Sequence, residues 1–296
     1  MPTFSHTVPD DPPRVRIDAY ALRVFSILPS RKQARKAIKA EELTLNGSPT
    51  SSARFVRPGD LLTLSVSTDP RMPVLQLTIP VAYCDRWMAI VCKPAGLHVR
   101  GNHRRTLHRA LRANLPISSE PDALPDPAPI HRIDFRTTGL VMVARTASAR
   151  VALSALFEHR QIHKRYRAIL VGRLDGDGTV NSAINGRPAT SRYTALQHSP
   201  SLHCTTLTTV DLFPETGRTH QLRRHMTSLG HPILGDDLYH NGQIYRGNGL
   251  FLCATQQRFT HPMTGEPITV SIDEPRKFAA YRDREARRWA RHHPLT

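Results

Sequence analysis

The segment HRIDFRTTGLVMVA, residues 131 to 144, places a charged loop directly before a continuous apolar run. Leu140 to Ala144 predict a buried strand, and Gly139 permits the tight turn that leads into it. One carboxylate, Asp134, lies in the loop with an arginine two residues away on either side. Because a buried strand holds the loop before it in place, Asp134 is a candidate catalytic group. A solvated ion pair with the arginines is the alternative.

The net charge predicts a polyanionic partner. The 296 residues include 41 lysines and arginines against 24 aspartates and glutamates, a formal charge of +17. Such a surplus favours nucleic acid first and an anionic membrane second. The chain contains no run of 18 apolar residues, and we expect neither a signal peptide nor a membrane partner. The length allows one large domain and one small one.

Cysteine and histidine spacing argues against metal and disulfide chemistry. None of the four cysteines forms a Cys-x-x-Cys pair, and the 16 histidines are scattered. We therefore expect no disulfide, no metal site and a reducing, cytoplasmic environment. The chain also lacks both the P-loop pattern and a strand-linked G-x-G-x-x-G, so we expect no nucleotide cofactor.

A small basic module is predicted near the N-terminus. Helical spacing begins at Ile17, and Ser30 is placed to cap a second helix, RKQARKAIKA. Asn46-Gly47 and Pro58-Gly59 predict turns of a short hairpin and a closing strand. On a helical wheel one arc of the second helix is basic, and the opposite side is apolar. The basic arc consists of Arg31, Lys32, Arg35, Lys36 and Lys39. It is either a nucleic-acid contact or an ordinary solvated helix face.

Further candidates lie in the remaining two thirds of the chain. Alternation in KRYRAILVG predicts a strand with Tyr166 on its apolar face. Thr219 is placed to cap a helix that Gly230 ends. The arginines at 218, 223 and 224 either reach inward from this helix or form its basic face. Lys93, before a proline turn, is a phosphate contact or, more commonly, a structural lysine.

Residues 16 to 65 resemble the S4 RNA-binding domain. The resemblance rests on Arg16-Ile17-Asp18, Ser30-Arg31-Lys32-Gln33-Ala34, Leu45-Asn46-Gly47 and Pro58-Gly59-Asp60. The glycine that the family has after the basic helix is absent. The resemblance implies that the second helix lies against RNA phosphates.

The larger part of the chain, residues 81 to 278, is similar to the RluA-type pseudouridine synthase family. Four ordered motifs carry the resemblance: KPAGL, HRIDFRTTGL, KRYRAIL and TGRTHQLRRHM…GHPILGDDLY. Ile133 and Thr138 are mild departures from the family pattern. Cys253 stands where the family has histidine, which leaves a secondary packing or hydrogen-bonding role in doubt.

The resemblance implies roles for individual residues. It makes Asp134 the nucleophile that attacks uridine, and Tyr166 the residue that packs against the base and is a candidate for removing the C5 proton. It makes Arg223 the partner of the aspartate, and Arg132 the residue that displaces the target base from its stack. Arg218 is expected to contact RNA. The isomerisation needs no cofactor or metal.

We expect an α+β chain with two domains and a basic tail. The domains are a small S4-like domain at 14–66 and a larger catalytic domain at 81–278, which has a mixed, largely antiparallel sheet flanked by helices. Residues 1–13 are expected to be a disordered leader, 67–80 a linker and 279–296 a basic tail outside the family-like region, with Ala279, Arg282, Glu285 and Trp289 along its ragged apolar edge. The expected activity is RNA pseudouridine synthesis by a monomer, acting on large-subunit (23S) ribosomal RNA. Transfer RNA is the alternative target, and a non-catalytic RNA-binding or ribosome-assembly factor is the alternative class.

Overall fold

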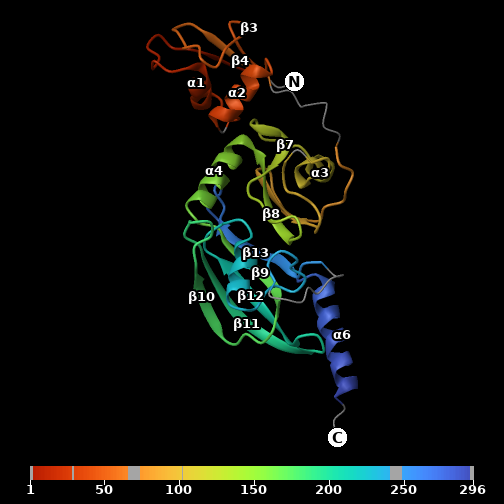
Figure 1. Ribbon diagram of the computed structural model, residues 1–296. Helices are drawn as coiled ribbons and strands as arrows, with labels where there is room; N and C mark the ends of the chain where they lie inside the picture. Colours follow the sequence, from red (N-terminus) through yellow and green to blue (C-terminus); the bar gives the residue numbers. More distant parts are fainter. Residues whose placement is uncertain (1–2, 29, 66–73, 102, 241–248, 294–296) are drawn as a thin grey trace.

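The computed structural model describes residues 3–28, 30–65, 74–101, 103–240 and 249–293. An N-terminal domain comes first along the chain (Figure 1). Its elements are β1 (Thr3–Thr7), α1 (Ile17–Val24), α2 (Arg31–Lys39), β2 (Leu43–Leu45), β3 (Ser48–Pro49) and β4 (Leu61–Ser65). Within the described residues, four strands form an antiparallel sheet in the order β1-β4-β2-β3.

The leader contains a strand, so our expectation that residues 1–13 are disordered is wrong. Residues 3 to 7 pair with β4 in antiparallel register, from Thr3 opposite Ser65 to Thr7 opposite Leu61. Ladder hydrogen bonds join main-chain groups and do not require apolar side chains. For this reason a polar, largely exposed segment still adds an edge strand to the sheet.

Local chemistry explains the two helices and two turns of this domain. The Ser30 hydroxyl accepts from the Gln33 N–H at 3.3 Å, which confirms the predicted cap of α2. The two predicted turns lie side by side, because the Asn46 side chain donates to Asp60 at 2.9 Å and accepts from the backbone N–H of Leu61 at 2.7 Å. One amide side chain therefore joins two turns that lie far apart in the sequence.

A larger domain carries the other elements. They are β5 (Val81–Cys84), β6 (Met88–Lys93), α3 (Leu107–Asn114), β7 (Ala123–Pro129), β8 (Thr138–Thr146), α4 (Ala147–Glu158), β9 (His163–Val171), β10 (Asp177–Asn181), β11 (Thr190–Ser201), β12 (Thr205–Pro214), α5 (Gln221–Ser228), β13 (Leu252–Thr260), β14 (Pro267–Ser271) and α6 (Arg276–His292).

One large sheet organises this domain. In the described residues its strands run in the order β10-β11-β12-β9-β13-β8-β6-β5, with β14 paired to β13 and β7 paired to β8. The pairing of β8 with β13 is parallel, and the other strand pairs are antiparallel. The expected α+β class with a mixed, largely antiparallel sheet is confirmed. None of the helices in the described ranges is long and apolar enough to span a membrane.

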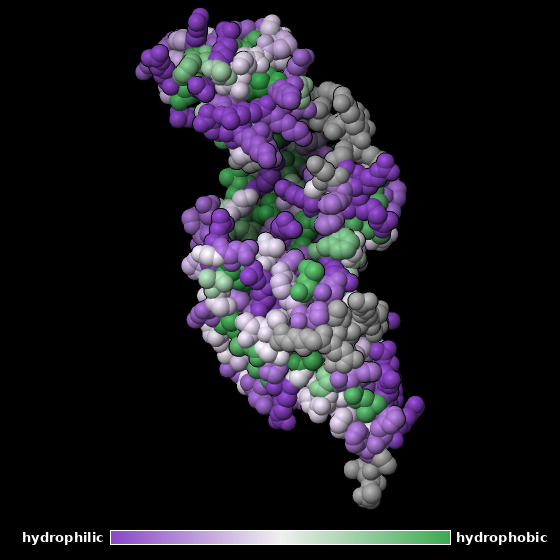
Figure 2. Space-filling view, viewed as in Figure 1, coloured by the Kyte–Doolittle hydropathy of each residue, from purple (hydrophilic) through white to green (hydrophobic). Residues whose placement is uncertain are grey.

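The two domains are in contact through the first turns of α4. The guanidinium of Arg150 donates to the carbonyls of Ser26 and Ile27, at 3.3 and 2.5 Å, and the Ile27 side chain packs against the core under α4. Figure 2 shows a hollow between the two domains, with hydrophilic residues on the N-terminal side of it. In the expected linker, residues 67–73 lie outside the described ranges, and residues 74–80 run along α3 without regular structure.

The C-terminal segment is part of the folded body, which corrects our expectation of a ragged tail. Helix α6 lies at the opposite end of the molecule from the N-terminal domain (Figure 1) and packs against β11. Tyr281 and Glu285 are buried, whereas Ala279, which we placed on the apolar edge, is exposed. The Ser201 hydroxyl donates to Glu285 at 2.7 Å, so a buried polar contact pins the helix to the sheet.

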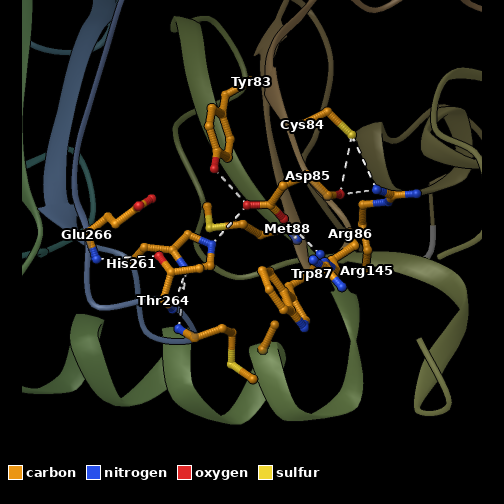
Figure 3. A network of polar contacts seen from close by, with 12 residues as sticks. Tyr83, Cys84, Asp85, Arg86, Trp87, Met88, Arg145, His261, Thr264 and Glu266 are labelled. Carbon is orange, nitrogen blue, oxygen red and sulfur yellow. Dashed lines mark hydrogen bonds and ion pairs between the residues drawn. The ribbon is translucent and has the colours of Figure 1, made fainter. Parts of the chain in front are cut away.

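Asp85 ties together two hairpin ends on the far edge of the sheet (Figure 3). Its carboxylate accepts from the Tyr83 hydroxyl at 2.7 Å, from the backbone N–H groups of Trp87 and Met88 at 2.7 and 2.8 Å, and from Nε2 of His261 at 2.9 Å. Burial alone would raise the pKa of Asp85, but these donors hold it below its usual value. The network holds the β5–β6 turn and the β13–β14 turn together through hydrogen bonds.

Candidate active site

One cavity of about 510 Å³ brings together the residues to which the sequence assigned chemistry. Asp134, Tyr166 and Arg223 line it, although they come from the loop before β8, from β9 and from α5. Arg132 and Arg218 also line it. The volume lies within the roughly 300–1,000 Å³ typical of ligand pockets. The five basic residues of α2 are not among its lining residues.

The loop that carries Asp134 is fixed from both sides. The Thr137 N–H donates to the Asp134 carbonyl at 3.1 Å, which closes a turn. Gly139 follows with a φ of +108°, and a Cβ there would collide with the backbone of Ala254 in β13. Only glycine allows β8 to begin this close to β13. The predicted glycine turn is therefore a requirement of the sheet beneath the site.

Lys93 holds the other side of the same loop. It is 1% exposed, and its Nζ donates to the carbonyls of Pro94 at 2.9 Å, Leu97 at 2.8 Å and Phe135 at 3.3 Å. Burial lowers the pKa of Lys93 to about 8, while the negative charge of Asp134 opposes that decrease. This agrees with the structural interpretation of Lys93, because its ammonium group donates to three backbone carbonyls.

His131 is a functional position to which the sequence patterns assigned no role. Its Nε2 accepts from the Met142 N–H at 3.0 Å, and its ring stacks on Phe157 at 4.6 Å between centroids. Burial, followed by the charge of Lys164, lowers the pKa of His131 to about 3. The imidazole is neutral at physiological pH and fixes the start of the loop that carries Asp134. Its place at the head of the HRID motif is the only sign of this role in the sequence.

Tyr166 lines the cavity from the middle of the sheet, where the family resemblance placed it, whereas the strand alternation predicted only its apolar face. It lies on β9 opposite Leu212 of β12 and Ala254 of β13. Burial raises the pKa of Tyr166 above its usual value, and the charge of Asp134 adds to the increase. The phenol therefore keeps its proton at neutral pH in the resting site. It presents a ring face and a hydrogen-bond donor to whatever occupies the cavity.

Arg223 does not pair with Asp134, which corrects the partner that the resemblance implied. It donates instead to Asp236, from Nε at 2.7 Å and from Nη2 at 2.6 Å, and both side chains are almost completely buried. Asp236 also accepts from the backbone N–H groups of Leu238 and Tyr239. A carboxylate that is shielded from water is stable as a charge only when hydrogen-bond donors replace the water, and Arg223 supplies two to Asp236. Asp134 keeps 20% of its side chain exposed, so water can still solvate it.

His220 lies close to the Asp134 carboxylate. Its Nε2 lies 3.9 Å from Oδ1 of Asp134, and its Nδ1 is 3.0 Å from the Tyr239 hydroxyl. His220 occupies the N-cap position of α5 with a φ of +54°, so the expected cap at Thr219 is wrong. Left-handed backbone at a non-glycine residue is costly and concentrates at functional sites. Here it aims the imidazole at the candidate nucleophile.

Some of the remaining basic candidates have exposed side chains, and others are already bonded to groups of the chain. Arg132 is exposed at the cavity, whereas the Arg218 Nε donates to the Pro188 carbonyl at 3.1 Å. On α2, Arg31 and Arg35 both bind the buried carboxylate of Asp18, at 3.0 and 2.7 Å. This pairing divides the predicted basic arc, because Arg31 and Arg35 bind Asp18 while about half of each side chain stays exposed. Lys32, Lys36 and Lys39 are exposed as well.

No cluster of metal-ligating side chains occurs within the described ranges. Cys253, which stands in place of a family histidine, is buried in β13 opposite Thr138 of β8. Burial raises the pKa of its thiol to about 11. The substituted position therefore contributes neutral packing between two strands below the cavity.

Comparisons with known proteins agree with this geometry. A family profile described as RNA pseudouridylate synthase matches residues 88–228. The solved structure of human RNA Pseudouridylate Synthase Domain Containing 1 superposes with a TM-score of 0.57 at 26% identity, covering 69% of this chain and 86% of that one. The fold is thus that of an RNA-modifying isomerase, a pseudouridylate synthase.

Curated relatives make the assignment narrower. Ribosomal large subunit pseudouridine synthase D from Xylella fastidiosa is 34% identical over 247 residues, which cover 79% of this chain and 73% of the relative. The protein of the same name from Xanthomonas campestris is 32% identical over 95% of this chain and 93% of its own length. The chain belongs to the RNA pseudouridine synthase family, of the RluA type.

Proposed function

We propose that Asp134 is the nucleophile of this pseudouridine synthase, with Tyr166 packing against the target base and Arg223, held by Asp236, forming part of the cavity wall. The observation that carries the proposal is the convergence of these three side chains on one cavity from separate parts of the chain. The cavity is partly enclosed, and such a site limits the access of water to the sugar while the glycosidic bond is open.

The reaction balances with groups that are present in the cavity. The Asp134 carboxylate attacks C1′ of the uridine as the bond between N1 and C1′ breaks, which leaves the sugar as an ester of Asp134. The released base turns, and C5 bonds to C1′ as the ester bond breaks and the carboxylate is released. The proton on C5 is lost and N1 gains one, so no oxidant, reductant or transferred group enters. Tyr166, with its raised pKa, holds the base in the resting complex as a packing surface and a hydrogen-bond donor.

A uridine stacked in a helix cannot reach this cavity, so the nucleotide must turn out of its stack. The exposed guanidinium of Arg132, at the cavity and two residues from Asp134, is placed to fill the space that the base leaves. Unstacking costs a few kcal/mol, which favours loops and bulges as targets. We propose that the N-terminal domain, as an S4-like module, adds phosphate contacts through the lysines of α2.

The proposed substrate is large-subunit ribosomal RNA. The relatives from Xylella fastidiosa and Xanthomonas campestris carry that substrate in their names. Ribosomal RNA is made in the bacterial cytoplasm, so this target agrees with the expected location. Transfer RNA remains the alternative target, and the expected monomer is checked by sedimentation of the purified chain.

The test of the nucleophile is Asp134→Asn, assayed by tritium release from RNA that carries 5-tritiated uridine. The amide nearly preserves the shape of the carboxylate but cannot attack, so we expect no release while RNA binding persists. Asp175→Asn is the matched control, since Asp175 is exposed and pairs with Arg173 and His198 at the surface. Activity of Asp134→Asn within tenfold of the control would reject the assignment.

The test of the substrate is a map of pseudouridines in total RNA from a strain that lacks the gene. Loss of a site in large-subunit ribosomal RNA, restored by the wild-type gene and not by Asp134→Asn, is the expected result. A site lost from transfer RNA would reassign the target, and no lost site in either RNA would favour the non-catalytic alternative.

A further inference from the structure

Three aromatic rings lie in contact one after another beside Asp134. His103 lies parallel to His98, with 4.0 Å between ring centroids and 7° between planes. The His98 centroid lies 4.5 Å from that of Phe135, with the two ring planes tilted by 37°. Phe135 is the residue directly after Asp134 and is 45% exposed. We refer to His98, His103 and Phe135 as the ring stack. None of the three takes part in the proposed reaction.

The ring stack is held rigidly to the loop of the nucleophile. The Phe135 carbonyl accepts from the Gly96 N–H at 2.8 Å and from Nζ of Lys93 at 3.3 Å. The His98 carbonyl accepts from the Leu107 N–H at 2.7 Å, which ties the same turn to α3. The rings thus come from two separate segments that backbone hydrogen bonds lock together. A preorganised surface of this kind loses little freedom when it binds a ligand.

The charges around the ring stack favour a nucleic-acid ligand. Desolvation, followed by the positive charges of His103, Lys93 and Arg132, lowers the pKa of His98, so its ring is neutral at physiological pH. The exposed cations at positions 104 and 105 follow His103 directly. An exposed aromatic face surrounded by cations matches a nucleobase with its flanking phosphates.

We propose that the ring stack receives an unpaired nucleobase that neighbours the target uridine in the RNA. Phe135 directly follows Asp134 in the chain, so its exposed ring belongs to the same short loop as the candidate nucleophile. When the target uridine occupies the cavity, the next base has lost a stacking neighbour. The exposed face of Phe135 replaces that neighbour. The inference rests on RNA as the substrate and does not depend on which RNA is modified.

The test couples a change in the protein to a change in the RNA. The probes are RNA stem-loops with a single loop uridine, in which one loop nucleotide on its 5′ or 3′ side lacks its base. Binding is measured at equilibrium for the wild type, Phe135→Leu and Phe135→Trp. Phe55→Leu is the matched control, since Phe55 is similarly exposed, at 44%, but lies on the N-terminal domain.

We expect Phe135→Leu to weaken binding of the intact stem-loop by about 5- to 100-fold, the usual range for one stacked base. Removing the contacted base should weaken wild-type binding by a similar factor but change Phe135→Leu little. Phe135→Trp should restore both the affinity and the sensitivity to base removal. Phe55→Leu should keep the wild-type sensitivity.

Equal losses on base removal for the wild type and Phe135→Leu, at each flanking position, would overturn the proposal. So would a loss of affinity that accompanies a lower melting temperature and that Phe135→Trp does not restore. That pattern would mean that the ring stack only packs the loop. Neither outcome depends on turnover, so failure here is distinguishable from failure of Asp134 as the nucleophile.

Discussion

Arg223 and Asp236 form a buried, two-pronged ion pair that supports the wall of the candidate active site. Burial alone would raise the pKa of Asp236, but the hydrogen bonds from Arg223 and from two backbone N–H groups hold it below the usual value. Arg223 therefore reaches Asp134 only through its longer-range field. The pair holds the guanidinium at the wall of the cavity and joins α5 to the loop that follows it.

The first prediction concerns this pair. Arg223→Met should lower the free energy of unfolding by about 3–5 kcal/mol, because it leaves the Asp236 carboxylate buried without its partner. Urea unfolding monitored by circular dichroism measures the change. Arg224→Met is the matched control, since Arg224 is only half-buried and bonds to Asn185 at 3.0 Å. Equal stability of the two variants would contradict the structural role of the pair.

The second prediction is a pH dependence that originates at His131. Its pKa is about 3 in the folded chain against the ordinary 6.5. Below pH 6.5 the unfolded chain binds a proton there and the folded chain does not. The unfolding free energy therefore falls as the pH decreases from 6.5 toward 3, by at most about 1.4 kcal/mol per unit.

His131→Gln has no titratable group at this position. The difference in stability between the wild type and this variant therefore reports the titration of His131 alone. Urea unfolding at a series of pH values between about 7.5 and about 4.5 should show the two proteins converging in stability as the pH falls. Parallel curves over that range would mean that His131 is protonated equally in both states.

The third prediction separates the cations of α2. Replacing Lys32, Lys36 and Lys39 with glutamine should reduce the slope of log affinity for RNA against log salt by about 0.7 to 0.9 for each phosphate group that the variant no longer binds. Thermal stability should change little, because these side chains are exposed. An unchanged slope in the triple variant would show that this face of α2 does not bind RNA.

The paired arginines provide the comparison for that experiment. Arg31→Gln with Arg35→Gln removes both guanidinium groups from Asp18, whose side chain has no solvent exposure. A buried acceptor that loses its donors costs about 1–3 kcal/mol. We expect this double variant to unfold at a lower temperature than the lysine variant. The reverse order of melting temperatures would contradict the pairing.

The fourth prediction concerns α6. Deleting residues 279–296 removes the buried Tyr281 and Glu285, so it should destabilise the chain by roughly 3–5 kcal/mol, as loss of a buried aromatic side chain does. Changing the exposed Arg287 and Arg291 to glutamine leaves Tyr281 and Glu285 in place. This charge variant should bind a long RNA more weakly and a short stem-loop normally, measured by filter binding. Equal loss with both RNAs would contradict a distant phosphate contact.

Periodicity and local motifs predicted the parts of the molecule that depend on neighbouring residues. The strand after Gly139, the face of Tyr166, the cap at Ser30 and the end of α5 before Gly230 follow from spacing alone. Each of these features depends on residues only a few positions apart, because side-chain periodicity and the capping of helix ends are local properties of the backbone. The family resemblance then placed Asp134, Tyr166 and Arg223 at one site.

The partner of each charged group was decided only by the tertiary structure. Arg223 pairs with an aspartate 13 residues later instead of Asp134, and Arg35 pairs with one 17 residues earlier. The chain offers many acceptors for every arginine, and spacing does not rank them. The choice follows burial, because a carboxylate removed from water must be matched by donors, while one near solvent need not be. Burial is known only after β strands and helices far apart in the sequence have packed together.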